Sequence, residues 1–134
     1  MKKIAALFCA MIACIMLFSS CSSVTSDPLD LAKFFVEEDY YASLDFDSDD
    51  IEYYADAFDV SPRGIDYVVY ASDWDDNYKS GCFMYCESNK KAKKLVEDLE
   101  DNFEDFEDDF KRCIIERNGK LVYVGCEDIW EMAE

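Results

Sequence analysis

The chain has 134 residues, of which 13 are basic and 31 acidic, so its net charge is −18, and it contains no histidine. This charge excludes binding to nucleic acid, because that affinity comes from cationic contacts with phosphate. The lack of histidine excludes histidine general bases, Ser–His or Cys–His nucleophile pairs and histidine-ligated metals. Aromatic residues form 16% of the sequence, which is typical of a folded domain and not of a disordered chain.

The start of the chain has the order of an export signal. Two lysines precede an uncharged, mostly apolar segment, 4–18, and two serines and Cys21 follow. The apolar segment is shorter than the roughly 20 residues of a membrane-spanning helix. The pattern resembles a bacterial lipoprotein signal with Cys21 as the lipidated residue, although Phe18 replaces the usual leucine. Ordinary cleavage and an uncleaved anchor are the alternatives.

This interpretation divides the chain into three parts. We expect a signal peptide over residues 1–20, a lipidated cysteine with a polar tether over 21–26, and a single domain over 27–134. Removal of the signal leaves 11 basic and 31 acidic residues, a net charge of −20. A diacylated Cys21 supplies the two chains that stable anchoring requires. The predicted location is therefore outside the cell, on the outer face of the cytoplasmic membrane.

The first half of the domain predicts two helices and a strand. Asp27 and Pro28 suit the cap and the first position of a helix that ends near Asp39. Apolar residues at helical spacing predict a second helix from about Ser48 to Phe58. The segment 65–72 is rich in β-forming residues and predicts a strand.

The second half alternates hairpins and helices. A polar loop over 73–80 leads to a strand over 81–87, and an apolar stripe then predicts one long helix from Ser88 to about Phe110. Strands over 112–117 and 120–126 flank Asn118-Gly119, a dipeptide typical of a tight hairpin turn. A short helix over 127–133 closes the chain. These elements predict an α+β fold: a four-stranded antiparallel sheet from two hairpins, covered by the long helix, with the two N-terminal helices at an edge or in the same layer.

Four cysteines lie in the predicted domain. Cys82 and Cys86 share one face of a strand but lie too far apart to bond without bending it. With Asn118-Gly119 as the turn, Cys113 faces Val124, and Cys126 is its diagonal neighbour. We expect buried free thiols on a face that meets the long helix. Disulfides between the hairpins and a cysteine-ligated metal are the alternatives.

No segment predicts a catalytic residue, a cofactor or a metal site. The segment 45–50 has aspartate at the first, third and fifth positions of a calcium loop. Its sixth position is Asp50 where such a loop needs glycine, so helix capping explains these acids better.

Two surfaces are candidates for interaction with a partner. The loop over 73–80 places aromatic side chains beside acids, which suits a protein anchor or a sugar site. The predicted long helix ends in a dense acidic segment that opposes the helix dipole. Folding an aromatic back onto the sheet and a simple solvated face are the plainer alternatives. The candidate interaction residues are Trp74, Asp75, Asp76, Tyr78, Glu104, Asp105, Glu107, Asp108 and Asp109.

Two stretches of the chain resemble small exported lipoproteins of anaerobic Gram-positive bacteria. They are the run 83–88 with the lysine-rich segment that follows it, and the run 116–125. The resemblance implies export, a lipid anchor and a hairpin–helix–hairpin order, and it brings no activity or functional residue.

The sequence thus predicts a membrane-anchored, non-catalytic protein-interaction or accessory module. Its predicted partners are the membrane, through the lipid on Cys21, and an unidentified protein. The alternative is a ligand-binding lipoprotein for a glycan or a divalent cation. An enzyme that uses carboxylates alone, as some glycosidases do, is the least favoured class.

Overall fold

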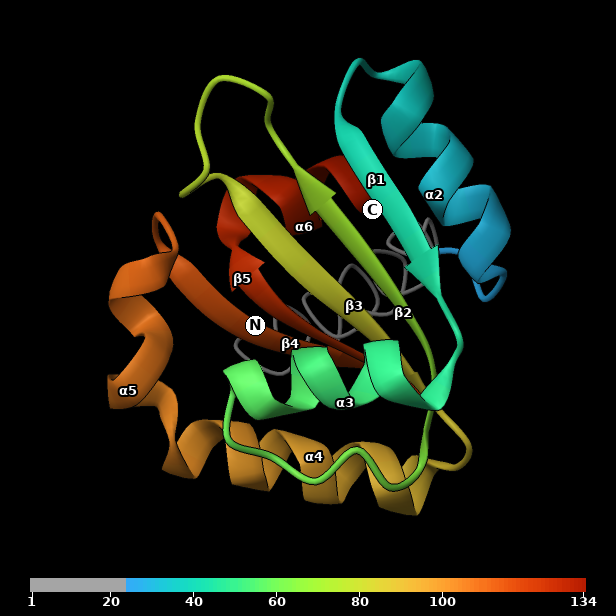
Figure 1. Ribbon diagram of the computed structural model, residues 1–134, viewed down its shortest axis with the longest axis vertical. Helices are drawn as coiled ribbons and strands as arrows, with labels where there is room; N and C mark the ends of the chain where they lie inside the picture. Colours follow the sequence, from blue (N-terminus) through green and yellow to red (C-terminus); the bar gives the residue numbers. More distant parts are fainter. Residues whose placement is uncertain (1–23) are drawn as a thin grey trace, which may run out of the picture.

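A computed structural model describes residues 24–134, so the predicted signal and Cys21 lie outside the described residues. Within this part of the chain, five antiparallel strands form one sheet, with helices on both faces (Figure 1). The strands are β1 (Tyr41–Asp45), β2 (Ile65–Ser72), β3 (Ser80–Cys86), β4 (Cys113–Asn118) and β5 (Leu121–Cys126). The helices are α2 (Pro28–Glu37), α3 (Ser48–Ala57), α4 (Asn89–Asp101), α5 (Phe103–Phe106), the 3₁₀ turn η1 (Glu107–Asp109) and α6 (Glu127–Ala133).

The sheet has the strand order β1-β2-β3-β5-β4, and every pairing is antiparallel. The α+β class is therefore confirmed, whereas the prediction of four strands is wrong. The additional strand, β1, pairs with β2 from Tyr41 opposite Ser72 to Asp45 opposite Val68. The sequence analysis assigned no element to this segment because it is short and half-exposed.

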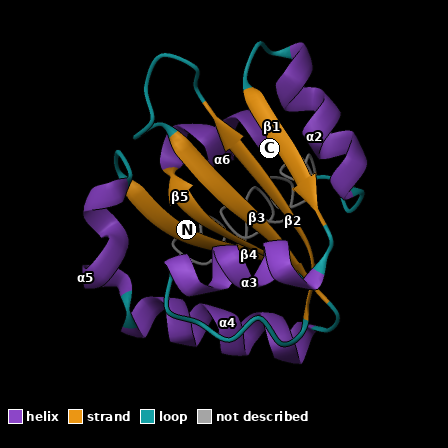
Figure 2. Ribbon diagram, in the orientation of Figure 1, coloured by secondary structure: helices purple, strands orange, loops and turns teal. Residues whose placement is uncertain are grey.

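Helices cover both faces of the sheet (Figure 2). On what we call the front face, α3, α4 and α5 pack on side chains such as Val68, Met84 and Val124. On the back face, α2 and α6 pack on Val69, Phe83 and their neighbours. Helices occur in both of the predicted N-terminal segments, with β1 between them. α3 lies in the same layer as α4, whereas α2 lies on the opposite face, so the expectation of one shared layer is wrong for α2. Alternation along the strands divides the apolar residues into these two cores.

The predicted long helix is broken at Asn102. α4 ends there, and the apolar stripe continues through the short α5 and the turn η1. The Asn102 amide donates to the carbonyl oxygen of Asp59 at 2.9 Å, which ties this point to the loop after α3. Acidic residues at the C-terminal end of a helix also oppose its dipole. Two aromatic residues of the stripe then pack against Phe58. The distance between ring centroids is 5.0 Å for Phe106 and 6.0 Å for Phe110.

The C-terminal hairpin has a different register from the predicted one. Asn118 pairs with Leu121, so the turn residues are Gly119 and Lys120. This register sets Cys113 opposite Cys126, where the sequence analysis set it opposite Val124. Cys126 belongs to the back core while Cys113 packs against the front core, so the expectation of one shared face is wrong. Gly125, which has φ +145°, interrupts the alternation just before Cys126.

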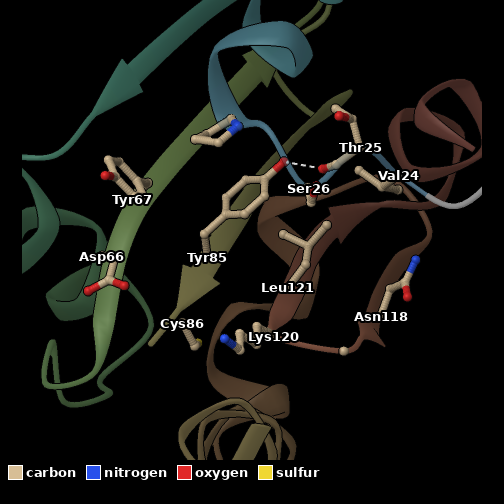
Figure 3. A pocket seen from close by; sticks show the side chains of 12 residues that line it. Val24, Thr25, Ser26, Asp66, Tyr67, Tyr85, Cys86, Asn118, Lys120 and Leu121 are labelled. Atoms are coloured by element: carbon tan, nitrogen blue, oxygen red, sulfur yellow. Dashed lines mark hydrogen bonds between the residues drawn. The ribbon is translucent and has the colours of Figure 1, made fainter. Parts of the chain in front are cut away.

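Residues Val24 to Ser26, which the sequence analysis placed in a tether, are docked on the back of the sheet. Val24 is buried in the back core. The hydroxyl of Tyr85 donates to the carbonyl oxygen of Thr25 at 2.9 Å. These contacts lie where β3 ends, beside the β4–β5 turn, at a hollow of about 850 Å³ (Figure 3). The described chain is therefore fixed to the sheet from its first residue.

Candidate functional site: an aromatic groove on the front face

The front face of the sheet is covered only in part. α3 and α4 lie across one half of it, and the other half extends toward the loop between β2 and β3 (Figure 1). A groove of about 390 Å³ lies in this second half, between α3, the segment after η1 and the start of β3. Its floor comes from β1, β2 and β3 through Tyr41, Tyr70 and Cys82.

Five aromatic side chains follow one another along the groove and its rim, and we call them the aromatic row. The rings lie 5.5 Å apart from Trp74 to Tyr41, 6.2 Å from Tyr41 to Tyr70, 6.0 Å from Tyr70 to Tyr54 and 5.4 Å from Tyr54 to Tyr53, between centroids. Four segments that are distant in sequence contribute them: β1, α3, β2 and the β2–β3 loop. The pairing of β1 with β2 is what brings the row together.

The ends of the aromatic row are open to solvent. Trp74 is 65% exposed, Tyr53 is 71% exposed and Tyr41 is 41% exposed. Large rings usually gain stability by burial, and a contiguous group left in water marks an interaction surface more often than a lone exposed ring does. The row is therefore the feature of the described chain that is most typical of a binding site.

The middle of the aromatic row is held by hydrogen bonds. Tyr54 donates its hydroxyl to the Asp45 carboxylate at 3.1 Å, and Ser43 donates to the same oxygen at 2.9 Å. Burial of the ring, the largest cause, together with the charge of Asp45 raises the pKa of Tyr54 well above its usual range. The phenol thus stays protonated and fixed, and it positions α3 against β1.

The loop that carries Trp74 is ordered by its own polar groups. Asp73 accepts a hydrogen bond from the backbone N–H of Asp75 at 2.9 Å, and Asp76 accepts one from Tyr78 at 3.0 Å. The backbone N–H of Asp73 also donates to the carbonyl oxygen of Lys79 at 2.9 Å. Such turns built by aspartate side chains fix a short loop without regular structure. The loop therefore presents Trp74 in a defined position against Tyr41.

The structure brings the two predicted interaction surfaces next to each other. The backbone N–H of Lys111 donates to the carbonyl oxygen of Tyr78 at 2.8 Å, and the Lys111 ammonium lies 3.9 Å from the Asp76 carboxylate. Asp109 lines the groove, and so does Asn77, which belongs to the loop that carries Trp74. The Trp74 loop and the end of the acidic segment therefore frame one groove.

Of the predicted interaction residues, Asp109 is the one that lines this groove, and Trp74 lies at its rim against Tyr41. The others do not line it: Asp75, Asp76, Tyr78, Glu104, Asp105, Glu107 and Asp108. Conversely, the sequence analysis missed the four tyrosines of the aromatic row. Tyr54 was read as part of an apolar helix stripe and Tyr70 as part of a strand. Alternation over 41–45, which sets Tyr41, Ser43 and Asp45 on one face, was the signal that could have placed Tyr41 beside Tyr70.

The cysteines of the domain are thiols that form no disulfide among residues 24–134. Burial raises the pKa of Cys86 and of Cys113 to about 11 each, and it raises the pKa of Cys82 further. A thiol with a raised pKa remains protonated near neutral pH and is a poor nucleophile. These side chains fill the core and are not suited to catalysis.

The part of the chain that the structure describes offers no ready metal site and no spare buried polar group. It brings no three acidic or cysteine side chains together in a cluster that could hold a metal ion, and the Asp45–Asp50 segment is divided between β1 and the start of α3. Every buried side-chain nitrogen and oxygen there has a hydrogen-bond partner. None of its helices has the length and hydropathy needed to cross a bilayer.

No protein-family model, no curated protein and no solved structure matches this chain. The comparisons accordingly identify no catalytic family and no catalytic fold.

Proposed function

We propose that this protein is a membrane-anchored, extracytoplasmic lipoprotein that acts as a non-catalytic protein-interaction module. The observation that carries the proposal is the aromatic row, which spans four chain segments and remains open at both ends. Trp and Tyr are the residues most enriched at protein interfaces, where a ring supplies a large contact area at low entropic cost. The groove beside them gives a partner side chain a place to enter.

The position of the groove supports a role on the outer surface. Cys21 precedes the docked residue Val24 by three positions, which span at most about 10 Å. Val24 to Ser26 lie at the end of β3, whereas the groove lies at its start. A lipid on Cys21 therefore holds one end of the sheet close to the membrane. The groove then faces away from the membrane, at the end that a partner can reach.

The charge of the domain supports a basic partner. The chain carries 31 acidic residues against 13 basic ones, and such a field attracts and orients cationic surfaces during encounter. It also keeps the protein from adhering directly to anionic lipid. The lipid anchor and the groove then have separate tasks, since one fixes the protein and the other recognises the partner.

A glycan is the competing ligand class, because Trp74 at the rim has an exposed ring on which a sugar could stack. Sugar sites usually add several hydrogen-bonding side chains to such a ring. In this groove, Ser80 already donates to the carbonyl oxygen of Asn77 at 3.0 Å. Asn77 and Asp109 are the remaining polar lining residues apart from the phenols. The protein-interaction reading is therefore the stronger one.

The direct test is in-cell crosslinking and affinity capture of the full chain, followed by identification of captured proteins. Trp74→Ala and Tyr41→Ala shorten the aromatic row and should each remove a stoichiometric partner. Tyr67→Ala is the matched control, because Tyr67 is also a strand tyrosine that is 41% exposed, but it lines the hollow at the other end of the sheet. Capture that is equally reduced in the control, or unaffected in all three variants, would overturn the proposal.

A further inference from the structure

We propose that the groove recognises a cationic side chain, lysine or arginine, presented by the partner. This inference rests on the proposed function and names the chemistry of what the groove receives. It is carried by three observations on the described residues: the mutual orientation of the rings, the sign of the charges that line the groove, and the presence of phenol hydroxyls with no partner.

The rings of the aromatic row stand at steep angles to one another. Tyr41 makes an interplanar angle of 62° with Tyr70 and of 81° with Trp74, whereas Tyr54 and Tyr70 stack at 29°. Rings set edge to face form a corner with aromatic walls on more than one side. A cation is attracted to the face of such a ring within about 6 Å of its centre. Steeply crossed rings therefore suit a compact cation better than a flat ligand.

The charges at the groove have one sign. Among the described residues that line it, none is basic, and the exposed Asp109 carboxylate stands at its edge. Asp45, behind Tyr54, accepts two hydroxyl hydrogen bonds and meets no lysine or arginine there. An uncompensated carboxylate next to aromatic faces favours a positive ligand and disfavours an anionic one.

The basic residues of the adjoining segments are already engaged. The Lys79 ammonium lies 3.9 Å from the Asp73 carboxylate and 5.5 Å from the centre of the Tyr40 ring. Lys111 lies 3.9 Å from the carboxylate of Asp76. These two lysines of the described chain are thus held outside the groove, and one of them lies against an aromatic ring. The hollow between the aromatic walls is left for a cation from another molecule.

Three phenols can add hydrogen bonds to such a cation. The hydroxyls of Tyr41, Tyr53 and Tyr70 have no hydrogen-bond partner within residues 24–134, unlike that of Tyr54. An ammonium or guanidinium group carries several donors and no acceptor, so it pairs with phenol oxygens and with the Asp109 carboxylate. A purely apolar ligand would leave these hydroxyls unsatisfied, which disfavours it.

The test is an NMR titration of the full chain in detergent micelles, with the tyrosine rings ¹³C-labelled and assigned by single Tyr→Phe variants. The probes are Nα-acetyl-lysine methylamide and Nα-acetyl-arginine methylamide, and the matched neutral probe is the same lysine derivative acetylated at Nε. The cationic probes should shift the Tyr41 and Tyr70 rings saturably, and the neutral probe should bind about tenfold more weakly or not at all. Tyr67 should not respond to either.

Two variants sharpen the test. Asp109→Asn removes one charge without removing a ring, so it should weaken the cationic probes severalfold and leave the neutral probe unchanged. Glu104→Gln removes a charge outside the groove and should have little effect on either probe. Equal binding of cationic and neutral probes, or ring shifts with chitotriose but not with lysine, would overturn the inference.

The outcomes separate this inference from the proposed function. If the Tyr41→Ala variant loses a captured partner but the cationic probes neither shift the rings nor compete with that partner, the interaction module stands and the cationic ligand is wrong. If the probes bind in the groove but no partner depends on Tyr41 in cells, the inference that the groove binds a cation stands and the protein-interaction proposal fails.

Discussion

The two faces of the sheet use the same kind of side chain in opposite ways. On the back face, Phe35, Phe83 and Tyr123 form an aromatic cluster with no exposed surface, and Trp130 closes it at 8% exposure. On the front face, the aromatic row has similar ring spacings, 5.4–6.2 Å, yet three of its rings remain in water. The difference lies in the cover, because α2 and α6 close the back face over this cluster whereas α3 and α4 leave the aromatic row partly open.

The contrast shows why ring content alone says little about function. Burial stabilises the back cluster, and its removal should be costly. The aromatic row gains less from burial, so truncating its exposed rings should lower the free energy of unfolding only slightly. The effect of such truncations should be seen in partner binding.

The largest effect is expected for truncation of Phe83 in the back cluster. Phe83→Ala removes a fully buried ring and should lower the free energy of unfolding by about 3–5 kcal/mol. Tyr53→Ala, at the exposed end of the front row, should change it by no more than about 0.5 kcal/mol. Urea unfolding of both variants measures the difference. Equal losses would mean that the front row is core and not a surface.

A smaller loss of unfolding free energy is expected for Gly125→Ala, which tests how closely β3 and β5 approach each other at this position. Gly125 pairs with Gly81, has φ +145°, and a Cβ added to it would overlap the Gly81 backbone. The Tyr123 ring packs over this glycine pair and its hydroxyl donates to the carbonyl oxygen of Cys126. Steric strain should therefore cost about 2–4 kcal/mol.

Gly119→Ala is the control for this substitution. Gly119 also has a positive φ, +62°, but a Cβ there would only make an ordinary contact, 4.0 Å from the side-chain oxygen of Asn89. The expected cost is about 1 kcal/mol, from the backbone conformation alone. If both glycines cost the same, the close approach of β3 and β5 at Gly81 is not what requires glycine at position 125.

The stability of the protein at alkaline pH tests whether α4 shields the front face from water. Burial raises the pKa of Cys86, below α4, from 9.0 to about 11. The unfolded chain therefore loses this proton first, so the stabilising contribution is complete below pH 9 and is lost as the pH rises to about 11. The loss should be on the order of 2 kcal/mol. Urea unfolding at pH 8, 9, 10 and 11 measures it.

Cys86→Ala provides the reference for that profile, since it removes the titrating thiol while keeping a small apolar side chain. Its free energy of unfolding should fall less steeply between pH 9 and 11 than that of the parent chain. Identical profiles would show that Cys86 is open to water in the folded protein and that α4 does not seal this part of the front face.

The smallest effect on stability is expected at the acidic edge of the groove. Asp109→Asn and Glu104→Gln change exposed carboxylates, so each should alter the free energy of unfolding by no more than about 0.5 kcal/mol. Capture of a basic partner should fall only in Asp109→Asn, because Asp109 lines the groove. A similar fall in Glu104→Gln would point to the overall acidic field instead of the groove.

Local pattern predicted those elements whose signals lie within the element itself. Ile65–Ser72 is rich in β-forming residues, and α2 begins at Pro28 with Asp27 capping two backbone N–H groups. Two of the failures arose from distant contacts. The Asn102 amide breaks the long helix through the carbonyl of Asp59, which is 43 positions away. β1 is a strand because it pairs with β2, since five half-exposed residues carry little strand signal alone.

The site was predictable to a similar extent. An exposed Trp74 between aspartates was visible in the sequence, and the loop does present it to solvent. The tyrosines that complete the aromatic row could not be grouped with it, because Tyr41, Tyr54 and Tyr70 meet only after β1 joins the sheet and α3 packs across it. The position of Cys126 on the back face likewise depended on Gly125, which interrupts the alternation of β5 and whose conformation only the folded chain reveals.

The central claim is that the open half of the front face, and not the sheet as a whole, recognises a partner. The most direct measurement is the amount of partner crosslinked in cells by Tyr41→Ala relative to Tyr67→Ala, two tyrosines of equal exposure at opposite ends of the sheet. The account predicts that capture is lost in Tyr41→Ala and kept in Tyr67→Ala while both variants remain folded. Capture that survives in Tyr41→Ala, or that is lost only in Tyr67→Ala, would contradict it.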